Sequence, residues 1–326
     1  MNPQTYKKQL DDAIREIEKL PLHRLDSDTK LLKQAFDIFF EREIFSLYKI
    51  DMKLHNDYKF ILFSTLTKHS GSLAFLAIQI LAANAIMSGN NFAKRELYFS
   101  KKCGIAINHL RAPVTVVSAT KCEGGYQLKG TLSWASGYEI FDTLLIGFHY
   151  DGCEYEAMAS FHKSQNFMVG EVAESFVGNS MATVNIELND FFVPDEDIVS
   201  SQIMGNYTKA KSISKTVHFA LYGVGCGAIE MVRDEEVKES AKQNLENIKE
   251  QFLSTNDGEV MDKLRIEMFV LIQKVVTTGM VLYGGKSILI DEKMQRYYRE
   301  LIMFNSNGLN TKIKELFKNE FLTNGG

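Results

Sequence analysis

The sequence predicts an α+β fold with an N-terminal helical domain, a central antiparallel β-domain and a C-terminal helical bundle. Two observations lead to this prediction. Apolar residues recur every three or four positions in the first and last parts of the chain, which is the period of a helix. Between these parts lie short segments rich in β-branched and aromatic residues, separated by Gly, Asp and Lys turns, which is typical of strands. The changes of period place the domains at residues 1–102, 103–200 and 201–326.

The N-terminal domain is expected to contain amphipathic helices and one buried helix. The segments YKKQLDDAIREIEKL and DTKLLKQAFDIFFEREIF have helical spacing, and Ser27 or Asp28 can cap the second. The run GSLAFLAIQILAANAIM, residues 71–87, contains Gln79 and Asn84 and falls short of the ~20 apolar residues of a membrane span. We therefore expect a buried helix there and no membrane span.

The C-terminal helices are expected to carry an interface between subunits. The segment KTVHFALYGVGCGAIEMV presents a face of small residues that permits close helix packing, namely Gly223, Gly225, Gly227 and Ala228. A long apolar helix is expected to include residues 269–283. It has more apolar surface than a single thin layer of helices would bury, which suggests that another subunit covers the rest. These features predict a homodimer or homotetramer built on the C-terminal helices.

Composition and charge exclude several classes of function. The 326 residues carry a formal net charge of −4 and no basic stripe, so a nucleic-acid-binding protein is not expected. The four cysteines are scattered and no His or Cys spacing matches a metal site, so we expect no metal. The N-terminal segment is a charged helix without the apolar core of a signal peptide, which predicts a cytoplasmic protein with reduced thiols.

Three stretches, in order along the chain, resemble the acyl-CoA dehydrogenase superfamily. GGYQLKGTLSWASGYEIFDTLLI resembles that family's G-G-Y-x-L-x-G-x-x-x-W segment, and VGNSMATVNIELNDFFVPDEDIV resembles its next β segment. YGGKSILIDEKMQRYYRE resembles its C-terminal G-G … (E/Q)-R-x-x-R-(D/E) stretch through Gly284, Gly285, Gln295, Arg296, Arg299 and Glu300. The resemblance covers residues 70–305 and is specific as a combination of motifs.

The resemblance implies that the protein binds FAD. Trp134 would cover one side of the flavin ring, and Ser136 would form a hydrogen bond with the edge of that ring. Gly284 and Gly285 would let the backbone approach the adenosine diphosphate part of the cofactor. The residues by themselves leave two other interpretations open: Trp134 fills the core of the β-domain, and the two glycines only end a helix.

The sequence departs from the family where its chemistry needs a carboxylate base. Relatives carry this Glu after the R-x-x-R-D stretch or at the start of the first long C-terminal helix. Here the two places read LIMFNSNGLNT, residues 301–311, and SKTVHFALYG, and neither holds an acid. Glu300 is expected to pair with Arg299, and the amides Asn305 and Asn307 cannot accept a proton. The family's T-E-P-x-x-G-S-D and R-x-x-F-G stretches are missing as well.

Two functions remain, and whether the protein is an enzyme stays open between them. The first is an FAD-dependent oxidoreductase of this superfamily that lacks the usual catalytic Glu and acts on a small-molecule or acyl-thioester substrate. If its chemistry is of the monooxygenase kind, His218 is a catalytic candidate ahead of His69 and His109, although a single His in an apolar helix can also be structural. The second is a catalytically degenerate homologue that acts as a ligand-binding protein or partner subunit.

Overall fold

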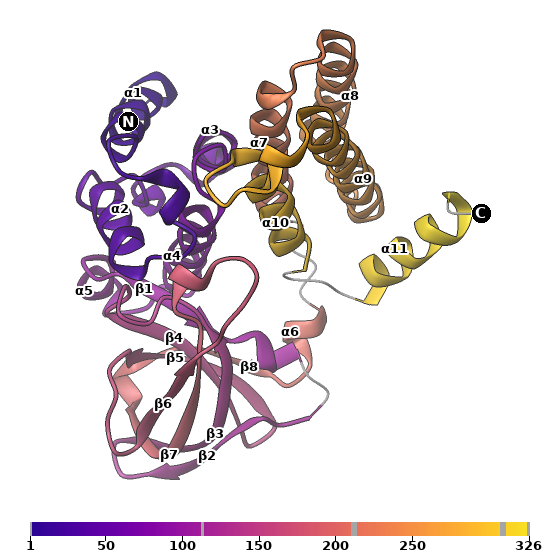
Figure 1. The fold of residues 1–326 in the computed structure, drawn as a ribbon. Helices are drawn as coiled ribbons and strands as arrows, with labels where there is room; N and C mark the ends of the chain where they lie inside the picture. Colours follow the sequence, from indigo (N-terminus) through magenta and orange to yellow (C-terminus); the bar gives the residue numbers. More distant parts are fainter. Residues whose placement is uncertain (1, 112–113, 210–213, 307–310, 325–326) are drawn as a thin grey trace. The chain divides into compact units, whose positions relative to one another are not determined.

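The computed structural model describes residues 2–111, 114–209, 214–306 and 311–324. The chain forms two compact units. The helical unit comprises residues 1–26, 53–74 and 213–326, and the sheet unit comprises residues 27–52 and 75–212. Figure 1 shows the elements of both units. Two elements run from one unit into the other, η3 (Met52–Leu54) and α4 (Gly71–Gly89).

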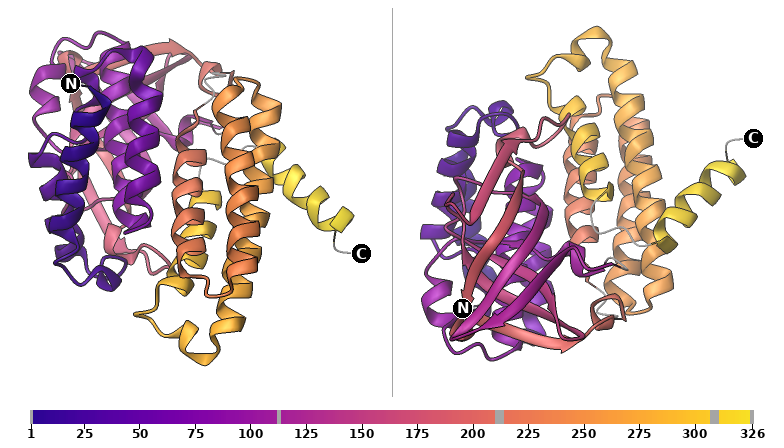
Figure 2. Two further views of the ribbon diagram at one scale, coloured as in Figure 1. Left: turned by 90° about the horizontal axis from the view of Figure 1, so that it is seen from above. Right: turned by 90° about the horizontal axis from the view of Figure 1, so that it is seen from below.

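The helical unit is built around four helices packed side by side, α7 to α10 (Figure 2). Its elements are α1 (Pro3–Ile17), η1 (Leu22–Arg24), α3 (His55–Leu66), α7 (Thr216–Met231), α8 (Glu235–Ser254), α9 (Gly258–Tyr283), η7 (Gly285–Ile288), α10 (Lys293–Ser306) and α11 (Thr311–Asn324). Acidic caps fix where two of the long helices begin. The side chain of Asp234 accepts a hydrogen bond from the Val237 amide, and Asp257 accepts one from the Glu259 amide.

The small residues of α7 are used for packing inside the chain. A Cβ atom on Gly223 would collide with Thr67 at the end of α3, and one on Gly227 would collide with the ring of Tyr297 on α10. Gly225 lies against Leu245 of α8 and Ile272 of α9. This face therefore lets α7 approach its neighbours within the helical unit, and it does not supply the subunit contact expected from the sequence.

The sheet unit contains a mixed sheet and helices that precede or connect its strands. The helical elements are α2 (Thr29–Glu41), η2 (Leu47–Lys49), α5 (Arg95–Phe99), η4 (Asn108–Arg111), η5 (Asn179–Met181), η6 (Asp195–Asp197) and α6 (Asn206–Lys209). The strands are β1 (Cys103–Ala106), β2 (Val117–Cys122), β3 (Gly125–Ala135), β4 (Thr143–Tyr150), β5 (Cys153–Ser160), β6 (Phe167–Val172), β7 (Val184–Pro194) and β8 (Ile198–Ile203).

The strand pairing is antiparallel except around β4. The order across the sheet is β6-β7-β3-β2-β4-β5-β8, and β1 joins through β4. β4 runs parallel to both β1 and β2, with Cys103 opposite Thr143 and Ser118 opposite His149. The predicted α+β fold class is confirmed, but the sheet is mixed because two of the strands that meet β4 arrive in the same direction.

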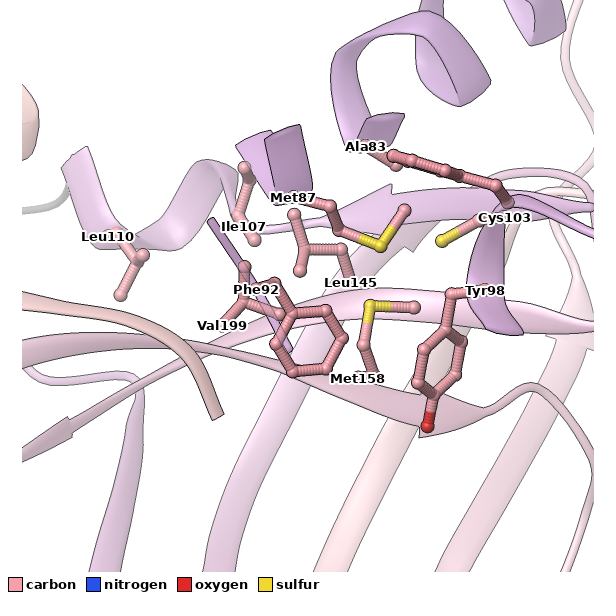
Figure 3. Close-up of a cluster of buried hydrophobic side chains, with 11 residues drawn as sticks. Ala83, Met87, Phe92, Tyr98, Cys103, Ile107, Leu110, Leu145, Met158 and Val199 are labelled. Atoms are coloured by element: carbon pink, nitrogen blue, oxygen red, sulfur yellow. The ribbon is translucent and has the colours of Figure 1, made fainter. Parts of the chain in front are cut away.

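One cluster of buried side chains joins this sheet to the helices that precede it (Figure 3). Met87 from α4 and Tyr98 from α5 pack against Leu145 of β4, Met158 of β5 and Val199 of β8. Each fully buried apolar side chain of this kind contributes about 1.5–3 kcal/mol relative to its exposed state. The cluster therefore fixes one face of the sheet.

Two described helices are long and apolar enough to cross a membrane. α4 has a mean hydropathy of 1.6 over its most apolar window, and 67% of that window is buried. The corresponding window of α9 has a mean hydropathy of 1.4 and is only 33% buried. The burial of α4 agrees with the buried helix predicted from the sequence, whereas α9 leaves apolar surface uncovered in this chain.

Candidate functional site

The indole of Trp134 lies on the surface of the sheet unit. Trp134 is 69% exposed and has a φ of 58°, in the left-handed region that side chains other than glycine rarely adopt. Its amide donates a hydrogen bond to Oδ1 of Asn185, 3.2 Å away at the start of β7. The pairing of β3 with β7 shifts register between Leu132 and Ala135, which produces this local geometry. Trp134 therefore does not fill the core.

Ser136 lies two residues further along the chain, just after the end of β3. Its side chain is buried, at 5% exposure, and its Oγ lies 2.8 Å from Oγ1 of Thr183. The next amide, that of Gly137, donates to the carbonyl of Met181 at 2.6 Å. The backbone that carries Ser136 is thus tied to the segment before β7, and the hydroxyl is held in one position by Thr183.

A shallow depression lies at the same end of the sheet. It has a volume of about 660 Å³ and is lined by residues that follow the end of β6, namely Val172, Ala173, Glu174, Ser175, Phe176 and Asn179. Val172 and Ala135 both pair with Val184 of β7, from opposite sides. Phe176 is 55% exposed. The end of the sheet that carries Trp134 therefore presents exposed aromatic side chains and a hollow to solvent.

Gly284 and Gly285 lie in the helical unit, at the end of α9. Gly284 has a φ of 76° and a ψ of −161°, a conformation that is essentially restricted to glycine, and its amide caps the helix through the Met280 carbonyl at 3.1 Å. A Cβ atom on either glycine would have no neighbour within 4 Å. The pair therefore ends the helix and also leaves bare backbone open to solvent, so both sequence interpretations of these glycines fit the structure.

His218 lies in the first turns of α7 and is 5% exposed. Its Nε2 lies 2.8 Å from the Met261 carbonyl, which requires a proton on Nε2 because a carbonyl only accepts. Burial lowers the pKa of His218 to about 4. The side chain is therefore neutral near pH 7, with a lone pair on Nδ1.

The other two histidines named from the sequence have structural contacts. Nδ1 of His69 is 3.6 Å from Oε1 of Glu18 in the helical unit, and burial lowers its pKa. Nε2 of His109 is 2.9 Å from the Gly147 carbonyl in the sheet unit. Trp134 and Ser136 are thus brought together in the sheet unit, while His218, Gly284 and Gly285 belong to the helical unit.

The Q-R-x-x-R-E stretch of α10 holds the turn between α3 and α4. Arg296 donates to the carbonyls of Lys68 and His69 at 2.7 and 2.6 Å, and Oε1 of Glu300 accepts the Gly71 amide at 2.7 Å. Burial raises the pKa of Glu300 to about 7, opposed by Arg296 at 3.5 Å and by the Gly71 amide. The stretch therefore has a structural role in the helical unit.

The expected pairing of Glu300 with Arg299 is wrong. Arg299 forms its ion pair with Asp26, while the basic group nearest Glu300 is Arg296, one turn earlier on α10. Residues three or four apart face the same side of a helix, whereas adjacent residues do not. The side chain of Glu300 therefore lies beside that of Arg296 and not beside that of Arg299. Glu300 lies 1% exposed against the start of α4 and acts as an acceptor for the amide there.

Sequence reasoning missed two buried cations near His218. Lys215 precedes α7 and Arg265 lies on α9, and they are 7% and 5% exposed. No local spacing marks either residue, because the helix ends that bring them together are far apart in the sequence.

Within the described ranges, no group of three or more His, Cys, Asp or Glu side chains could hold a metal ion. Residues 307–310 lie outside the described residues. They include Asn307 and belong to the segment 301–311, which holds no acidic residue.

Solved flavoenzymes share the fold over nearly the whole chain. KijD3 in complex with FMN and a dTDP-linked amino keto sugar has a TM-score of 0.77 at 12% identity, covering 98% of this chain and 94% of that one. A glutaryl-coenzyme A dehydrogenase–glutaryl-CoA complex has a TM-score of 0.75 at 11% identity, covering 99% and 96%. A nitrososynthase from Micromonospora carbonacea var. africana has a TM-score of 0.74 at 12% identity, covering 98% and 96%.

The likeness defines the class of fold. The chain has the acyl-CoA dehydrogenase fold that the sequence resemblance implied. No protein-family model matches the sequence, and no curated protein matches it.

The Glu300 contact predicts a cost for any side chain at Gly71. A Cβ atom there would lie 2.6 Å from Cδ of Glu300, so Gly71→Ala must displace a buried acid. We expect a loss of about 1–3 kcal/mol in the free energy of unfolding, measured by urea denaturation. Gly89→Ala at the other end of α4 is the control, because a Cβ atom there has no neighbour within 4 Å. Equal stability of the two variants would contradict the assigned role of Glu300.

Proposed function

We propose that this protein is a flavin-dependent oxidoreductase that binds FAD against Trp134. The observation that carries the proposal is an exposed indole in left-handed backbone at a strand end. A residue in this conformation costs roughly 1–2 kcal/mol, and an exposed tryptophan gains little from burial to offset it. Such strain persists where it positions a side chain for binding. The fold, shared with enzymes such as an FMN-bound KijD3, supports a flavin as the ligand.

The residues at the strand end fit a flavin ring by their chemistry. A flavin is a flat aromatic ring system with a polar rim, so it needs an aromatic face and a few fixed hydrogen-bonding groups. Trp134 supplies the face and Ser136 supplies a hydroxyl held by its partner Thr183. In the helical unit, Gly284 and Gly285 present backbone without side chains, which makes them a separate candidate for a contact with a diphosphate group. The bound cofactor would supply the redox chemistry.

The substrate is proposed to be a small molecule or an acyl thioester, processed without the usual carboxylate base. Neither place where relatives carry the Glu holds an acid in this sequence. Glu300 and His218 are buried, at 1% and 5% exposure, and each makes a structural hydrogen bond, with the Gly71 amide and the Met261 carbonyl. A well-placed general base contributes on the order of 10²–10⁴ in rate, so ordinary α,β-dehydrogenation is not expected. The second candidate, a ligand-binding or partner subunit that has lost its chemistry, is favoured by the same lack of a base.

Replacement of Trp134 separates a binding role from a structural one. Trp134→Gly removes an exposed side chain and relieves left-handed backbone, so we expect the free energy of unfolding to stay level or to rise by up to about 1 kcal/mol. FAD occupancy of the purified variant should fall, because the aromatic face is lost. Absorbance in the flavin bands and urea denaturation measure the two effects. Phe192→Ala is the control, an exposed aromatic residue of β7. Full flavin occupancy in Trp134→Gly would refute the assignment.

Anaerobic mixing with acyl-CoA tests the proposed loss of dehydrogenase chemistry. FAD-loaded protein is mixed with a panel of saturated acyl-CoAs of different lengths, and flavin absorbance is followed by stopped flow. We expect no rapid bleaching with any of them, because neither place where relatives carry the Glu holds an acid in this sequence. Rapid bleaching by one thioester would show a base in use and would overturn this part of the proposal.

We also propose that the protein forms a homo-oligomer through the end of α9. Five large apolar side chains are exposed there and follow one another closely in the sequence: Val281 at 80%, Leu282 at 59%, Ile288 at 72%, Leu289 at 52% and Ile290 at 75%. A concentration of exposed apolar residues of this kind marks an interaction surface. The partner we propose is a second copy that brings the same patch across a two-fold axis, because such an interface covers the patch on both chains at once.

A charge placed in this patch should separate the subunits. We expect Ile288→Asp combined with Ile290→Asp to shift the mass from dimer or tetramer to monomer in sizing with light scattering, because a buried unpaired carboxylate costs several kcal/mol. Lys286→Asp, which replaces a residue that is already charged in the same segment, should have a smaller effect. A monomeric wild-type protein would contradict the proposal.

A further inference from the structure

One carboxyl group is enclosed inside the helical unit, and only one of its two oxygens has a partner. Glu300 of α10 is 1% exposed. Its Oε1 accepts the Gly71 amide at 2.7 Å, whereas Oε2 is buried and has no hydrogen-bond partner. A buried oxygen without a donor is more costly when it carries charge than when it is neutral. The surroundings of Oε2 therefore favour an oxygen that carries a proton.

The cation nearest to Glu300 forms no hydrogen bond with it. Nε of Arg296 is 3.5 Å from Oε1 of Glu300 and has no hydrogen-bond partner of its own. The other two nitrogens of Arg296 donate to the carbonyls of His69 and Lys68 at 2.6 and 2.7 Å, and the guanidinium lies 4.7 Å from the centre of the Tyr297 ring. The positive charge is thus stabilised by carbonyl groups and an aromatic ring, so it does not depend on an ionised Glu300.

The second cation of α10 is paired with another acid. Arg299 forms an ion pair with Asp26, which also accepts a hydrogen bond from the Ser72 hydroxyl at 3.1 Å. Asp26 is 8% exposed, and its negative charge disfavours a second negative charge on Glu300. Burial and the charge of Asp26 raise the pKa of Glu300 to about 7, although the two arginines of α10 and the amide at the start of α4 act in the opposite direction.

We propose that Glu300 is a proton-linked latch at the start of α4, closed while Oε2 carries a proton and loosened when the carboxyl group ionises. In the protonated form Oε1 accepts the Gly71 amide, and the acid adds no buried charge. Ionisation leaves a charge on Oε2 with no donor beside it, so the turn between α3 and α4 must move to supply a donor or to admit water. Because α4 continues from this turn into the sheet unit, the proton controls how firmly the first residue of that helix is fixed.

The proton on Glu300 links the stability of the fold to pH. A glutamate in the unfolded chain has its ordinary pKa of 4.5, whereas Glu300 in the folded chain keeps its proton up to about pH 7. The stabilisation is therefore complete below pH 4.5 and is lost as the pH rises through about 7. Within this window the ratio of folded to unfolded protein falls by up to about tenfold for each pH unit.

The histidine in the turn between α3 and α4 has a pH dependence of the opposite sign. Nδ1 of His69 lies 3.6 Å from Oε1 of Glu18, and burial lowers the pKa of His69. A histidine whose pKa is lowered by folding contributes stability that is lost as the pH falls, whereas Glu300 contributes stability that is lost as the pH rises. The lysine beside it, Lys68, forms an ion pair with Glu230 of α7. A loss of stability on raising the pH towards 8 therefore cannot come from His69.

Urea denaturation of the full-length protein at about pH 5.5 and pH 8 tests the latch. We expect the folded-to-unfolded ratio of the wild type to fall by about tenfold or more between these two values. Glu300→Gln should lose much less, because Gln keeps an acceptor for the Gly71 amide and has no charge to gain. Glu267→Gln, which changes an exposed acid of α9, should behave as the wild type. All proteins are compared at one concentration and without added FAD, so the result does not depend on the flavin proposal. Equal pH dependence in the wild type and Glu300→Gln overturns the latch.

A titration of the wild type decides the question even where Glu300→Gln does not fold. In protein labelled with ¹³C at the glutamate carboxyl groups, the Glu300 resonance should change with a midpoint of about pH 7. Glu156 of β5 is the matched comparison, a buried acid whose Oε2 does have a donor, the Ser200 hydroxyl at 2.6 Å, and Glu156→Gln identifies its resonance.

Hydrogen exchange reports on the latch itself. We expect the protection of the Gly71 amide to be about tenfold lower at pH 8 than at pH 5.5, because the turn loosens when Glu300 ionises. The proposal is overturned if every glutamate other than Glu156 titrates at its ordinary pH, or if the protection of the Gly71 amide is the same at both values.

Discussion

The buried contact between α10 and the turn joining α3 to α4 is the interaction on which the helical unit depends. Arg296 holds two carbonyls at the end of α3, and Glu300 holds the first amide of α4. These backbone groups lie at helix ends, where no partner within a helix exists for them. Because α4 continues from this contact into the sheet unit, the same side chains set where the most apolar helix of the chain begins. The stretch of α10 that resembles the family therefore has a structural role in this chain.

The strand end at Trp134 is exposed and has an unfavourable backbone conformation, unlike the buried contact of Glu300. The Glu300 contact satisfies buried groups, whereas Trp134 is left in left-handed backbone with most of its surface in solvent. Its strain is stabilised by the hydrogen bond to Asn185 and by the fixed segment around Ser136. An arrangement that is unfavourable in the free chain and becomes favourable when a flat ring covers the indole is consistent with a binding role. The helical bundle contributes stability, and the sheet unit contributes the proposed ring-binding surface.

Much of the fold could be predicted from the sequence because its signals are local. The apolar run at residues 71–87 predicts a buried helix that the structure gives as Gly71–Gly89, and Asp28 caps α2 as one of two expected candidates. The resemblance to the acyl-CoA dehydrogenase superfamily led to Trp134 and Ser136. The sequence could not show that Trp134 is exposed with a positive φ, because this follows from the register shift between β3 and β7. Nor could it show that the buried cations Lys215 and Arg265 lie near His218, since they come from helices that are far apart in the sequence. The small residues of α7 were assigned to the wrong contact because close packing within a chain and between chains needs the same residues.

Fluorescence of the single tryptophan tests the central claim most directly. Trp134 is the one indole in the 326-residue sequence, so all tryptophan emission comes from the proposed flavin-facing side chain. Protein freed of flavin is titrated with FAD, and emission is followed together with absorbance. The account predicts that FAD quenches the emission in a saturable way that ends at one FAD per chain, because the bound ring lies against the indole. Binding of FAD with unchanged Trp134 emission at saturation would contradict it.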